Sequence, residues 1–126
     1  EGPQVISYRA APAPHTAMQP GMITSNEPGL YRPGRWGVRI ENLLCNRVAG
    51  ESEFGEFLDF ETLTLCPIDT RCVLPEQMRA DELAWLNAYH AEVRRRLTPY
   101  LGGDALGWLL RRTEPILSAQ SEGGQL

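Results

Sequence analysis

Hydrophobic and polar positions in the first half of the chain follow the pattern of short strands. Apolar and β-branched residues recur between polar ones in four stretches, which predicts strands over residues 4–8, 21–27, 36–48 and 57–65. A proline-rich stretch separates the first two, and no regular element is expected there. Residues 49–55, with two glycines and two glutamates, are expected to form a surface loop.

The spacing of apolar residues changes in the second half of the chain. There they step by three or four positions, which predicts an amphipathic helix over residues 80–97. A second helix is predicted from Asp104, as its N-cap, to about Thr113, before Pro115. The tail over residues 118–126 is polar and glycine-rich, so we expect it to be loose. Antiparallel strands followed by two C-terminal helices predict a mixed α/β (α+β) class.

Composition and charge argue against two classes of partner, nucleic acids and membranes. With 126 residues and 42% apolar residues, it is long enough to bury a core. Its formal charge of −4 argues against nucleic acid as the main partner. The basic clusters Arg94–Arg96 and Arg111–Arg112 fall in the last turns of the predicted helices, where cations complement the helix dipole. No apolar run approaches the ~20 residues of a membrane span, so no membrane partner is expected.

The cysteines indicate the compartment. Cys45, Cys66 and Cys72 are odd in number and form no Cys-x-x-Cys pair, which argues against a zinc site. We expect reduced thiols packed in strands of a cytoplasmic protein. The chain also begins at Glu1 without an initiator methionine, and its first block reads like the middle of a folded domain. We therefore treat it as a fragment.

Two glutamates are the candidate chemistry. Glu27 and Glu41 are 41 − 27 = 14 residues apart, and the midpoint, Gly34, lies in the sequence Arg-Pro-Gly-Arg. A hairpin about that turn would place the two carboxylates opposite each other, with Cβ atoms roughly 4.5–5.5 Å apart. Like charges so placed repel, so we expect a cation between them, and carboxylate oxygens suit a divalent metal.

Alternation along the strands brings two more side chains to the pair. Arg39 shares a face with Glu41, and Tyr31 shares one with Glu27 if that strand stays extended past Pro28. Two simpler interpretations remain open: a turn glutamate plus a solvated strand glutamate, or both carboxylates paired to Arg39. A guanidinium that orients ligating carboxylates, with a phenol beside it, favours the metal site.

Four segments resemble a known family. Gly21–Tyr31, which contains Ser-Asn-Glu-Pro-Gly-Leu-Tyr, and Gly37–Asn42, Gly-Val-Arg-Ile-Glu-Asn, resemble the last two metal-ligand motifs of the pita-bread metallopeptidases. Phe60–Ile68 and Trp85–His90 resemble the cytosolic Xaa-Pro aminopeptidases (aminopeptidase P) among them. The resemblance covers residues 1 to about 117, and the four motifs occur in the family's order.

The resemblance implies a site and a reaction. The family has a pita-bread fold with two divalent ions, usually manganese, held by two aspartates, one histidine and two glutamates. Glu27 and Glu41 match the glutamate ligands, with Glu41 bridging both ions and Glu27 also a candidate proton shuttle. Arg39 and Tyr31 match the supporting pair of catalytic residues. The implied reaction is hydrolysis of the N-terminal Xaa-Pro bond of peptides with proline at the second position, by a metal-activated hydroxide.

The resemblance also implies an organisation. Residues 1–68 match the C-terminal part of the catalytic domain, 69–117 a C-terminal helical extension that contributes to a homodimer, and 118–126 the tail. The family's other three ligands precede the motif that begins at Glu1. The chain therefore holds two of five ligands, and we expect it to be inactive by itself, the metal ions belonging to the full-length parent.

Several alternatives accompany this prediction. A prolidase or creatinase-type hydrolase shares the fold but resembles the segment after Leu65 poorly. A non-catalytic pita-bread module for binding or dimerisation is the other alternative, although paired glutamates argue against it. Glu61 matches a family position, and we interpret it as structural or interfacial. His90 is expected to be a packed or surface residue of the helix, not a metal ligand.

Overall fold

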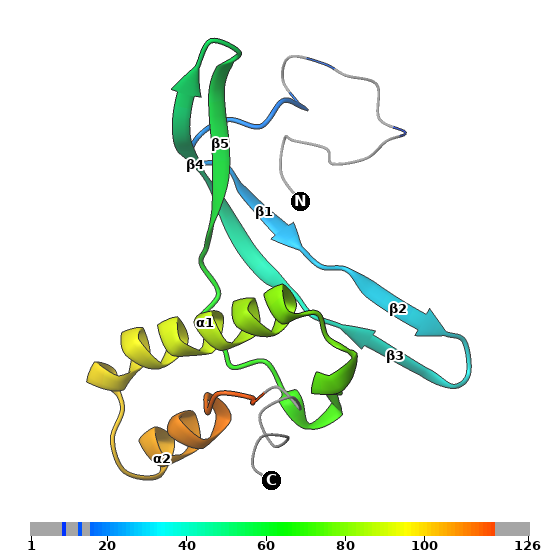
Figure 1. Cartoon of the computed structure of the whole chain (residues 1–126), viewed down its shortest axis with the longest axis vertical. Coiled ribbons are helices and arrows are strands. Elements are labelled where there is room, and N and C mark those ends of the chain that lie inside the picture. The colour runs from blue at the N-terminus through cyan, green and yellow to red at the C-terminus, as the bar shows by residue number, and fades with distance from the viewer. Residues whose placement is uncertain (1–8, 10–12, 14–15, 118–126) are drawn as a thin grey trace, which may run out of the picture. The chain divides into compact units, whose positions relative to one another are not determined.

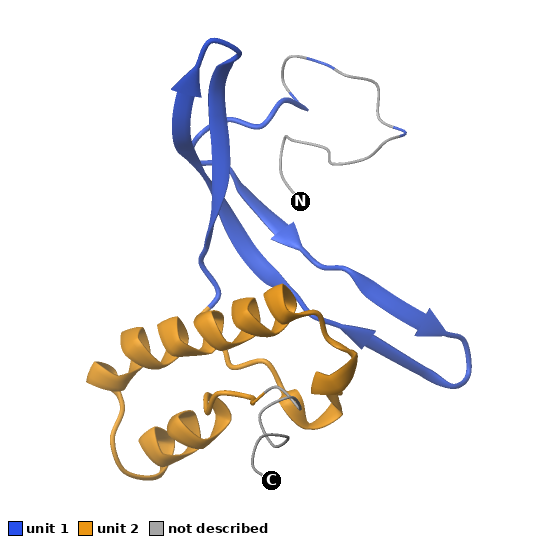
Figure 2. Ribbon diagram, in the orientation of Figure 1, with its two compact units in different colours: residues 1–64 blue, residues 65–126 orange. Residues whose placement is uncertain are grey.

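The computed structural model describes residues 9, 13 and 16–117, and its elements are labelled in Figure 1. The chain divides into two compact units, residues 1–64 and residues 65–126 (Figure 2). The predicted strand over residues 4–8 and the predicted loose tail over residues 118–126 lie outside the described residues. The predicted domain boundary after residue 68 stays a prediction.

The first unit is made of antiparallel strands. A three-stranded sheet has the order β1-β4-β5, and a two-stranded sheet pairs β2 with β3 (Figure 1). The strands are β1 (Ile23–Asn26), β2 (Gly29–Arg32), β3 (Trp36–Arg39), β4 (Asn42–Ser52) and β5 (Gly55–Thr62).

The strand predicted over residues 36–48 is interrupted between β3 and β4. Register places Pro28 opposite Ile40, since Gly29 pairs with Arg39 and Asn26 with Asn42. Proline has no backbone N–H to donate to the ladder, so regular pairing lapses at this point of both strands.

The surface loop predicted over residues 49–55 is wrong. β4 continues to Ser52 and β5 begins at Gly55, so a two-residue turn joins them. Gly55 has φ of 121°, a conformation that favours glycine. A register shift between Val48 and Gly50 absorbs one residue as a bulge. The glycines and acids of this segment therefore mark a bulge and a tight hairpin turn.

The predicted packing of the cysteines in strands is correct for one residue in three. All three cysteines are free, and Cys45 is buried in β4. Cys66 and Cys72 are exposed and lie after β5, outside the strands. The strand predicted to residue 65 ends at Thr62, although the backbone N–H of Leu63 still donates to the carbonyl of Leu43 at 2.8 Å.

The second unit contains two α-helices, α1 (Ala80–Leu97) and α2 (Gly103–Arg112), which confirms the predicted pair. Short 3₁₀ turns lie at Thr70–Cys72, Pro75–Gln77 and Thr98–Tyr100. The N-cap of α2 is Gly102, and Asp104 lies in the first turn, where its charge still complements the helix dipole. The predicted Asp104 cap is therefore wrong by two residues. Among the described residues, neither helix combines the length and the hydropathy that a membrane span needs.

This unit has its own apolar core. Tyr89, Val93 and Leu109 are buried together, and four partly buried side chains pack around them: Leu65, Ile68, Leu97 and Leu101. Side chains of α1 also fix two connecting segments. Asn87 exchanges two hydrogen bonds of 2.9 Å with the backbone of Ile116, and the Tyr89 hydroxyl donates to the carbonyl of Cys66 at 2.8 Å.

His90 lies fully buried in α1, as a packed residue. Its Nε2 accepts the backbone N–H of Ile68 at 3.0 Å, so the ring is the neutral tautomer with its proton on Nδ1. Burial, and then the charge of Arg94, hold the pKa of His90 below its ordinary value. The prediction that it packs in the helix holds, and its ring contacts backbone of its own unit.

Candidate metal site on the hairpin

The site is positioned by a continuous register. Asn26 pairs with Asn42 on one side of the interruption, and Gly29 pairs with Arg39 on the other. Both pairs have residue numbers that sum to 68, so no slip occurs between them. The same register places Glu27 opposite Glu41, as the turn centred on Gly34 predicts. Gly34 has φ of 69°, a left-handed conformation that glycine favours, within the three-residue turn between β2 and β3.

One guanidinium connects the predicted site residues. Arg39 Nη1 lies 2.5 Å from Glu27 Oε2 and 3.8 Å from Glu41 Oε2. Arg39 Nε donates to the Tyr31 hydroxyl at 2.7 Å. The structure therefore brings together all four residues of the predicted site, on the face where odd-numbered positions of both strands lie.

A fifth residue of this network was missed by the sequence analysis. The Ser25 hydroxyl donates to Glu27 Oε1 at 2.9 Å, while Arg39 holds Oε2. Both oxygens of this carboxylate thus accept a hydrogen bond, and each keeps a lone pair for another partner. The signal was present in the sequence, because Ser25 is two positions before Glu27 and shares its face of the extended chain.

The charges of the cluster do not cancel. Two carboxylates and one guanidinium sum to −1, and the hydrogen bond from Arg39 to Tyr31 raises the pKa of Arg39, which keeps it cationic. The side chains of Glu27 and Glu41 are 42% and 49% exposed. Opposed carboxylates with open lone pairs and residual negative charge form a donor set that suits a hard divalent cation.

The pair is not a complete metal site. In the part of the chain that the structure describes, no group of three or more His, Cys, Asp or Glu side chains could hold a metal ion. Glu27 and Glu41 are two donors, fewer than the four to eight ligands that divalent ions usually take in proteins.

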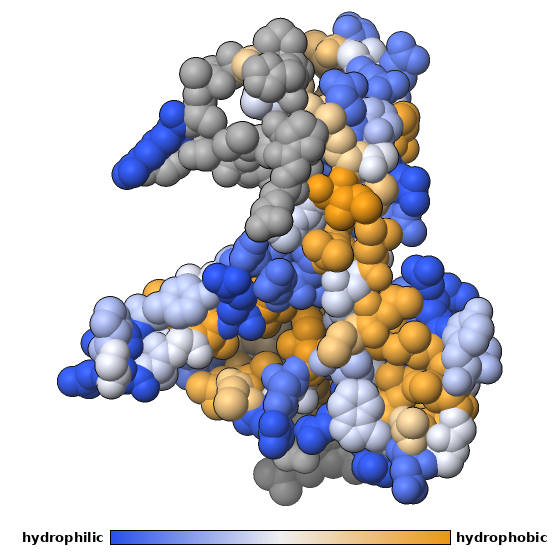
Figure 3. Space-filling view, turned by 180° about the vertical axis from the view of Figure 1, so that it is seen from behind, coloured by the Kyte–Doolittle hydropathy of each residue, from blue (hydrophilic) through white to orange (hydrophobic). Residues whose placement is uncertain are grey.

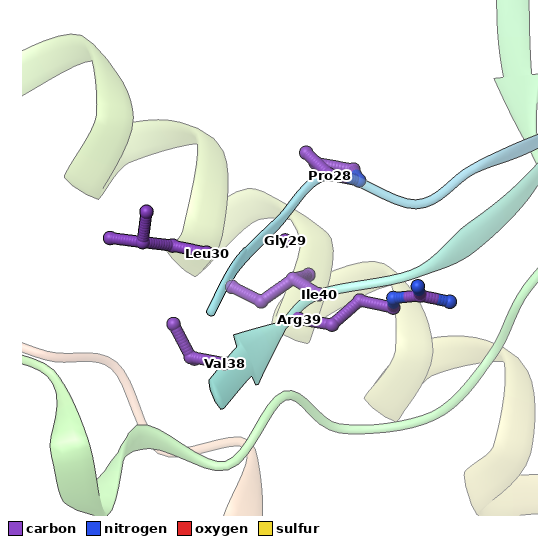
Figure 4. Close-up of a pocket in the computed structure, with 6 residues that line it drawn as sticks. All are labelled: Pro28, Gly29, Leu30, Val38, Arg39 and Ile40. Carbon is purple, nitrogen blue, oxygen red and sulfur yellow. The ribbon is translucent and has the colours of Figure 1, made fainter. Parts of the chain in front are cut away.

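The opposite face of the same hairpin is apolar. An open pocket of about 370 Å³ is lined by six residues: Pro28, Gly29, Leu30, Val38, Arg39 and Ile40. Figure 4 shows the side chains of Leu30 and Arg39 running in opposite directions, as alternation along paired strands requires. Leu30 is 62% exposed, and hydrophobic residues are visible on the surface in Figure 3. The carboxylates thus lie on the polar face of a two-sided ribbon.

Glu61 has a different environment. Its carboxylate accepts from Arg47 Nε at 2.5 Å, between neighbouring strands β5 and β4. The same hydrogen bond raises the pKa of Arg47. Glu61 therefore has an ordinary cross-strand partner, and its structural or interfacial role stays a prediction.

Comparisons with known proteins identify the family. Residues 1–45 match the model of metallopeptidase family M24, and residues 56–116 match the model of the C-terminal region of peptidase M24. The chain belongs to metallopeptidase family M24. Both matches fall in the expected order for this family, and together they include β1 to β3 and both helices.

Individual M24 relatives make the comparison more specific. The chain is 43% identical over 121 residues to a probable Xaa-Pro aminopeptidase P of Coprinopsis cinerea, covering 92% of this chain and 19% of that protein. It is 45% identical over 120 residues to aminopeptidase P2 of Arabidopsis thaliana, covering 92% of this chain and 17% of that protein. The chain therefore spans less than a fifth of the length of these relatives.

A solved structure matches as well. The X-prolyl aminopeptidase of Caenorhabditis elegans, described as a cytosolic enzyme with a di-nuclear active site, superposes with a TM-score of 0.68 at 35% identity. The match covers 79% of this chain and 17% of that one. The predicted resemblance to aminopeptidase P is confirmed, and so is the mixed α/β class of a pita-bread portion with antiparallel strands and two helices.

Proposed function

We propose that this chain is the C-terminal part of the catalytic domain of a metal-dependent Xaa-Pro aminopeptidase. The complete protein would hydrolyse the N-terminal bond of peptides that carry proline at the second position. The observation that carries the proposal is the opposed pair Glu27 and Glu41 with Arg39 shared between them. The names of the relatives and the di-nuclear site of the worm enzyme support it.

Glu27 and Glu41 would hold two divalent ions, which we propose to be manganese, together with ligands outside the described residues. Such a metal pair, when bound, supplies a Lewis acid and activates water for attack on a peptide carbonyl. The chain's own residues prepare the ligands. Ser25 and Arg39 fix the two oxygens of Glu27, and Tyr31 fixes Arg39. Glu27 is also the proposed site of proton uptake.

The setting of the complete enzyme is part of the proposal. We infer a cytoplasmic homodimer, with the C-terminal extension over residues 69–117 contributing to the contact between copies. The description of the worm relative as cytosolic supports the compartment. Exposed aromatic side chains on the helical unit, Trp85 and Trp108, offer apolar surface for such a contact.

The activity is tested on the complete protein that contains this chain. With manganese present, it should release the first residue from an Xaa-Pro-Yaa tripeptide and leave the matched Xaa-Ala-Yaa peptide intact. Glu41→Gln should abolish release, whereas Glu61→Gln, which changes a carboxylate away from the hairpin, should retain it. No release from either peptide by the wild-type protein would contradict the proposal and favour a non-catalytic module.

The chain by itself should be inactive. It offers two opposed carboxylates, and the described residues include no group of three potential ligands. Titration of the isolated chain with Mn²⁺ should therefore give binding far weaker than that of the complete protein. Tight binding of two ions by the isolated chain would show that the pair needs no further ligands.

A further inference from the structure

Two glycines of the hairpin lie beneath the ring of Tyr31. Tyr31 pairs with Gly37 and Gly29 pairs with Arg39, so these four residues occupy one face as two adjacent cross-strand pairs. The four Cα positions form the corners of a rough square. Gly29 and Gly37 occupy one pair of opposite corners, and Tyr31 and Arg39 occupy the other pair. The Tyr31 ring spans the glycine diagonal, and its hydroxyl meets Arg39 Nε at 2.7 Å.

The space above both glycines is filled by the ring. A Cβ added at Gly37 would lie 2.6 Å from Cδ1 and 3.1 Å from Cε1 of Tyr31. A Cβ added at Gly29 would lie 2.6 Å from Cζ and 2.7 Å from Cε2, and still closer to the hydroxyl. Contacts under 3.0 Å are not made by real Cβ atoms, so alanine at either position forces the ring to move.

Backbone conformation does not explain these glycines. The positive-φ glycines of the described chain are Gly21, Gly34, Gly55 and Gly103, and neither Gly29 nor Gly37 is among them. Both lie within strands, where glycine costs stability relative to alanine and often marks a close approach by another group. The close approach here is the aromatic ring, which covers the gap that each missing side chain leaves.

The position of the ring determines the rest of the network. Arg39 uses Nε for the Tyr31 hydroxyl and Nη1 for Glu27, so both hydrogen bonds come from one rigid planar group. The guanidinium carbon lies 5.8 Å from the centre of the Tyr31 ring. A ring lifted off the glycines would carry its hydroxyl away from Nε and leave Arg39 free to rotate away from Glu27.

We propose that Gly29 and Gly37 are positioning residues: they form a flat floor for the Tyr31 ring, which sets Arg39 and, through it, the carboxylate of Glu27. The geometric part of this proposal stands on the hairpin alone. Its effect on metal binding rests on the proposed function. The floor thus extends the functional unit from the polar side chains to two positions that have none.

A double-mutant cycle in the complete protein tests the floor. Gly37→Ala should lower the melting temperature when Tyr31 is present, because the new methyl group collides with the ring. In the Tyr31→Ala background the same substitution should leave the melting temperature unchanged or raise it, because alanine is the better strand residue once the ring is gone. Gly50→Ala is the matched control, since a Cβ there meets nothing within 4 Å.

Metal affinity tests the positioning role. Gly37→Ala should weaken Mn²⁺ binding about 10–100-fold, the usual effect of disturbing residues that orient metal ligands, and Gly50→Ala should leave it unchanged. In the Tyr31→Ala background, Gly37→Ala should cause no further loss. Gly29→Ala should behave like Gly37→Ala in both measurements.

The outcomes separate the two levels of the proposal. Equal loss of melting temperature in both backgrounds, or no loss in either, would overturn the floor. If the melting temperatures follow the expected pattern while Gly37→Ala leaves Mn²⁺ affinity unchanged, that result would overturn the positioning role of the glycines. If Glu41→Gln also left Mn²⁺ affinity unchanged, the metal site of the proposed function would be wrong, and the melting cycle would still decide whether the glycines support the ring.

Discussion

The two units of the chain use their side chains in opposite ways. In the helical unit, Tyr89, Val93 and Leu109 are buried together, and even the polar residue His90 is fully buried against backbone. In the hairpin of the strand unit, every residue of β2 and β3 is exposed, including apolar ones such as Leu30 and Val38.

The residues that stabilise the fold and the candidate site residues therefore lie in different units of the chain. The helical unit buries an apolar core and satisfies its connecting segments, so its own contacts supply a driving force for folding. The hairpin instead holds two repelling carboxylates and two strand glycines, each of which costs stability. Burial within the described residues therefore contributes less to the stability of the hairpin than to that of the helical unit.

The largest expected effect is a cavity in the helical unit. Leu109→Ala should lower the free energy of unfolding by about 2–5 kcal/mol, because Leu109 is fully buried in the core of this unit. Leu110→Ala is the matched control, since Leu110 is exposed on the same helix. Chemical denaturation followed by circular dichroism measures both. Equal losses for the two leucines would break the distinction between the faces of α2.

The next effect depends on pH. His90→Leu leaves the buried N–H of Ile68 without an acceptor and should cost about 1–3 kcal/mol at pH 8. Burial holds the pKa of His90 below its ordinary value of 6.5, so the unfolded state binds more protons than the folded state as pH falls. The stability that His90 contributes is therefore present above about pH 6.5 and lost as pH falls through the folded-state pKa.

This pH effect is checked by unfolding at pH 5 to 8. The difference between wild type and His90→Leu should be largest at pH 8 and should shrink below pH 6.5. Taking the difference between the two proteins removes the titration of every group that they share. A difference that is constant over this range would show that the pKa of His90 is the same in the folded and unfolded protein, which contradicts its burial.

A smaller effect is expected where Asn87 holds the segment after α2. Asn87→Ala removes two hydrogen bonds to the backbone of Ile116 and should cost about 1–2 kcal/mol. Asn87→Asp keeps the acceptor for the Ile116 N–H but places a carboxylate oxygen against the Ile116 carbonyl, so it tests the two hydrogen bonds separately. Faster hydrogen exchange at Ile116, confined to the alanine variant, would locate the effect. Unchanged exchange in both variants would contradict the contact.

The smallest effect is expected at the exposed pair between β4 and β5. Glu61→Gln weakens its contact with Arg47, but both side chains face water, and exposed ion pairs contribute little to stability. Its melting temperature should match that of wild type within error. A loss as large as that of Leu109→Ala would mean that Glu61 has a role which its surroundings in this chain do not explain.

Sequence patterns predicted the helices and the hairpin, because these elements are determined by residues close together in the chain. Both helices follow from apolar spacing, and the register of the hairpin follows from the turn at Gly34. The interruption at Ile40 was missed because the missing N–H of Pro28 acts on the facing strand, far away in sequence. The segment after Val48 was misassigned because its glycines serve a bulge and a turn within a long hairpin.

The site shows the same division. Alternation predicted that Tyr31, Arg39 and the two glutamates meet on one face. It did not predict the ring of Tyr31 lying over Gly29 and Gly37, because that contact depends on a side-chain orientation which strand period does not determine. The burial of His90 also required the tertiary structure, since its partner Ile68 lies 22 positions away.

The central claim is that Glu27 and Glu41 are metal ligands, and the metal content of the complete protein tests it most directly. Wild type and Glu61→Gln should each retain two Mn²⁺ ions per chain after dialysis, because Glu61 lies away from the site. Glu27→Gln and Glu41→Gln should each lose at least one ion while remaining folded by circular dichroism. Full retention of both ions with unchanged affinity in Glu41→Gln would contradict the account.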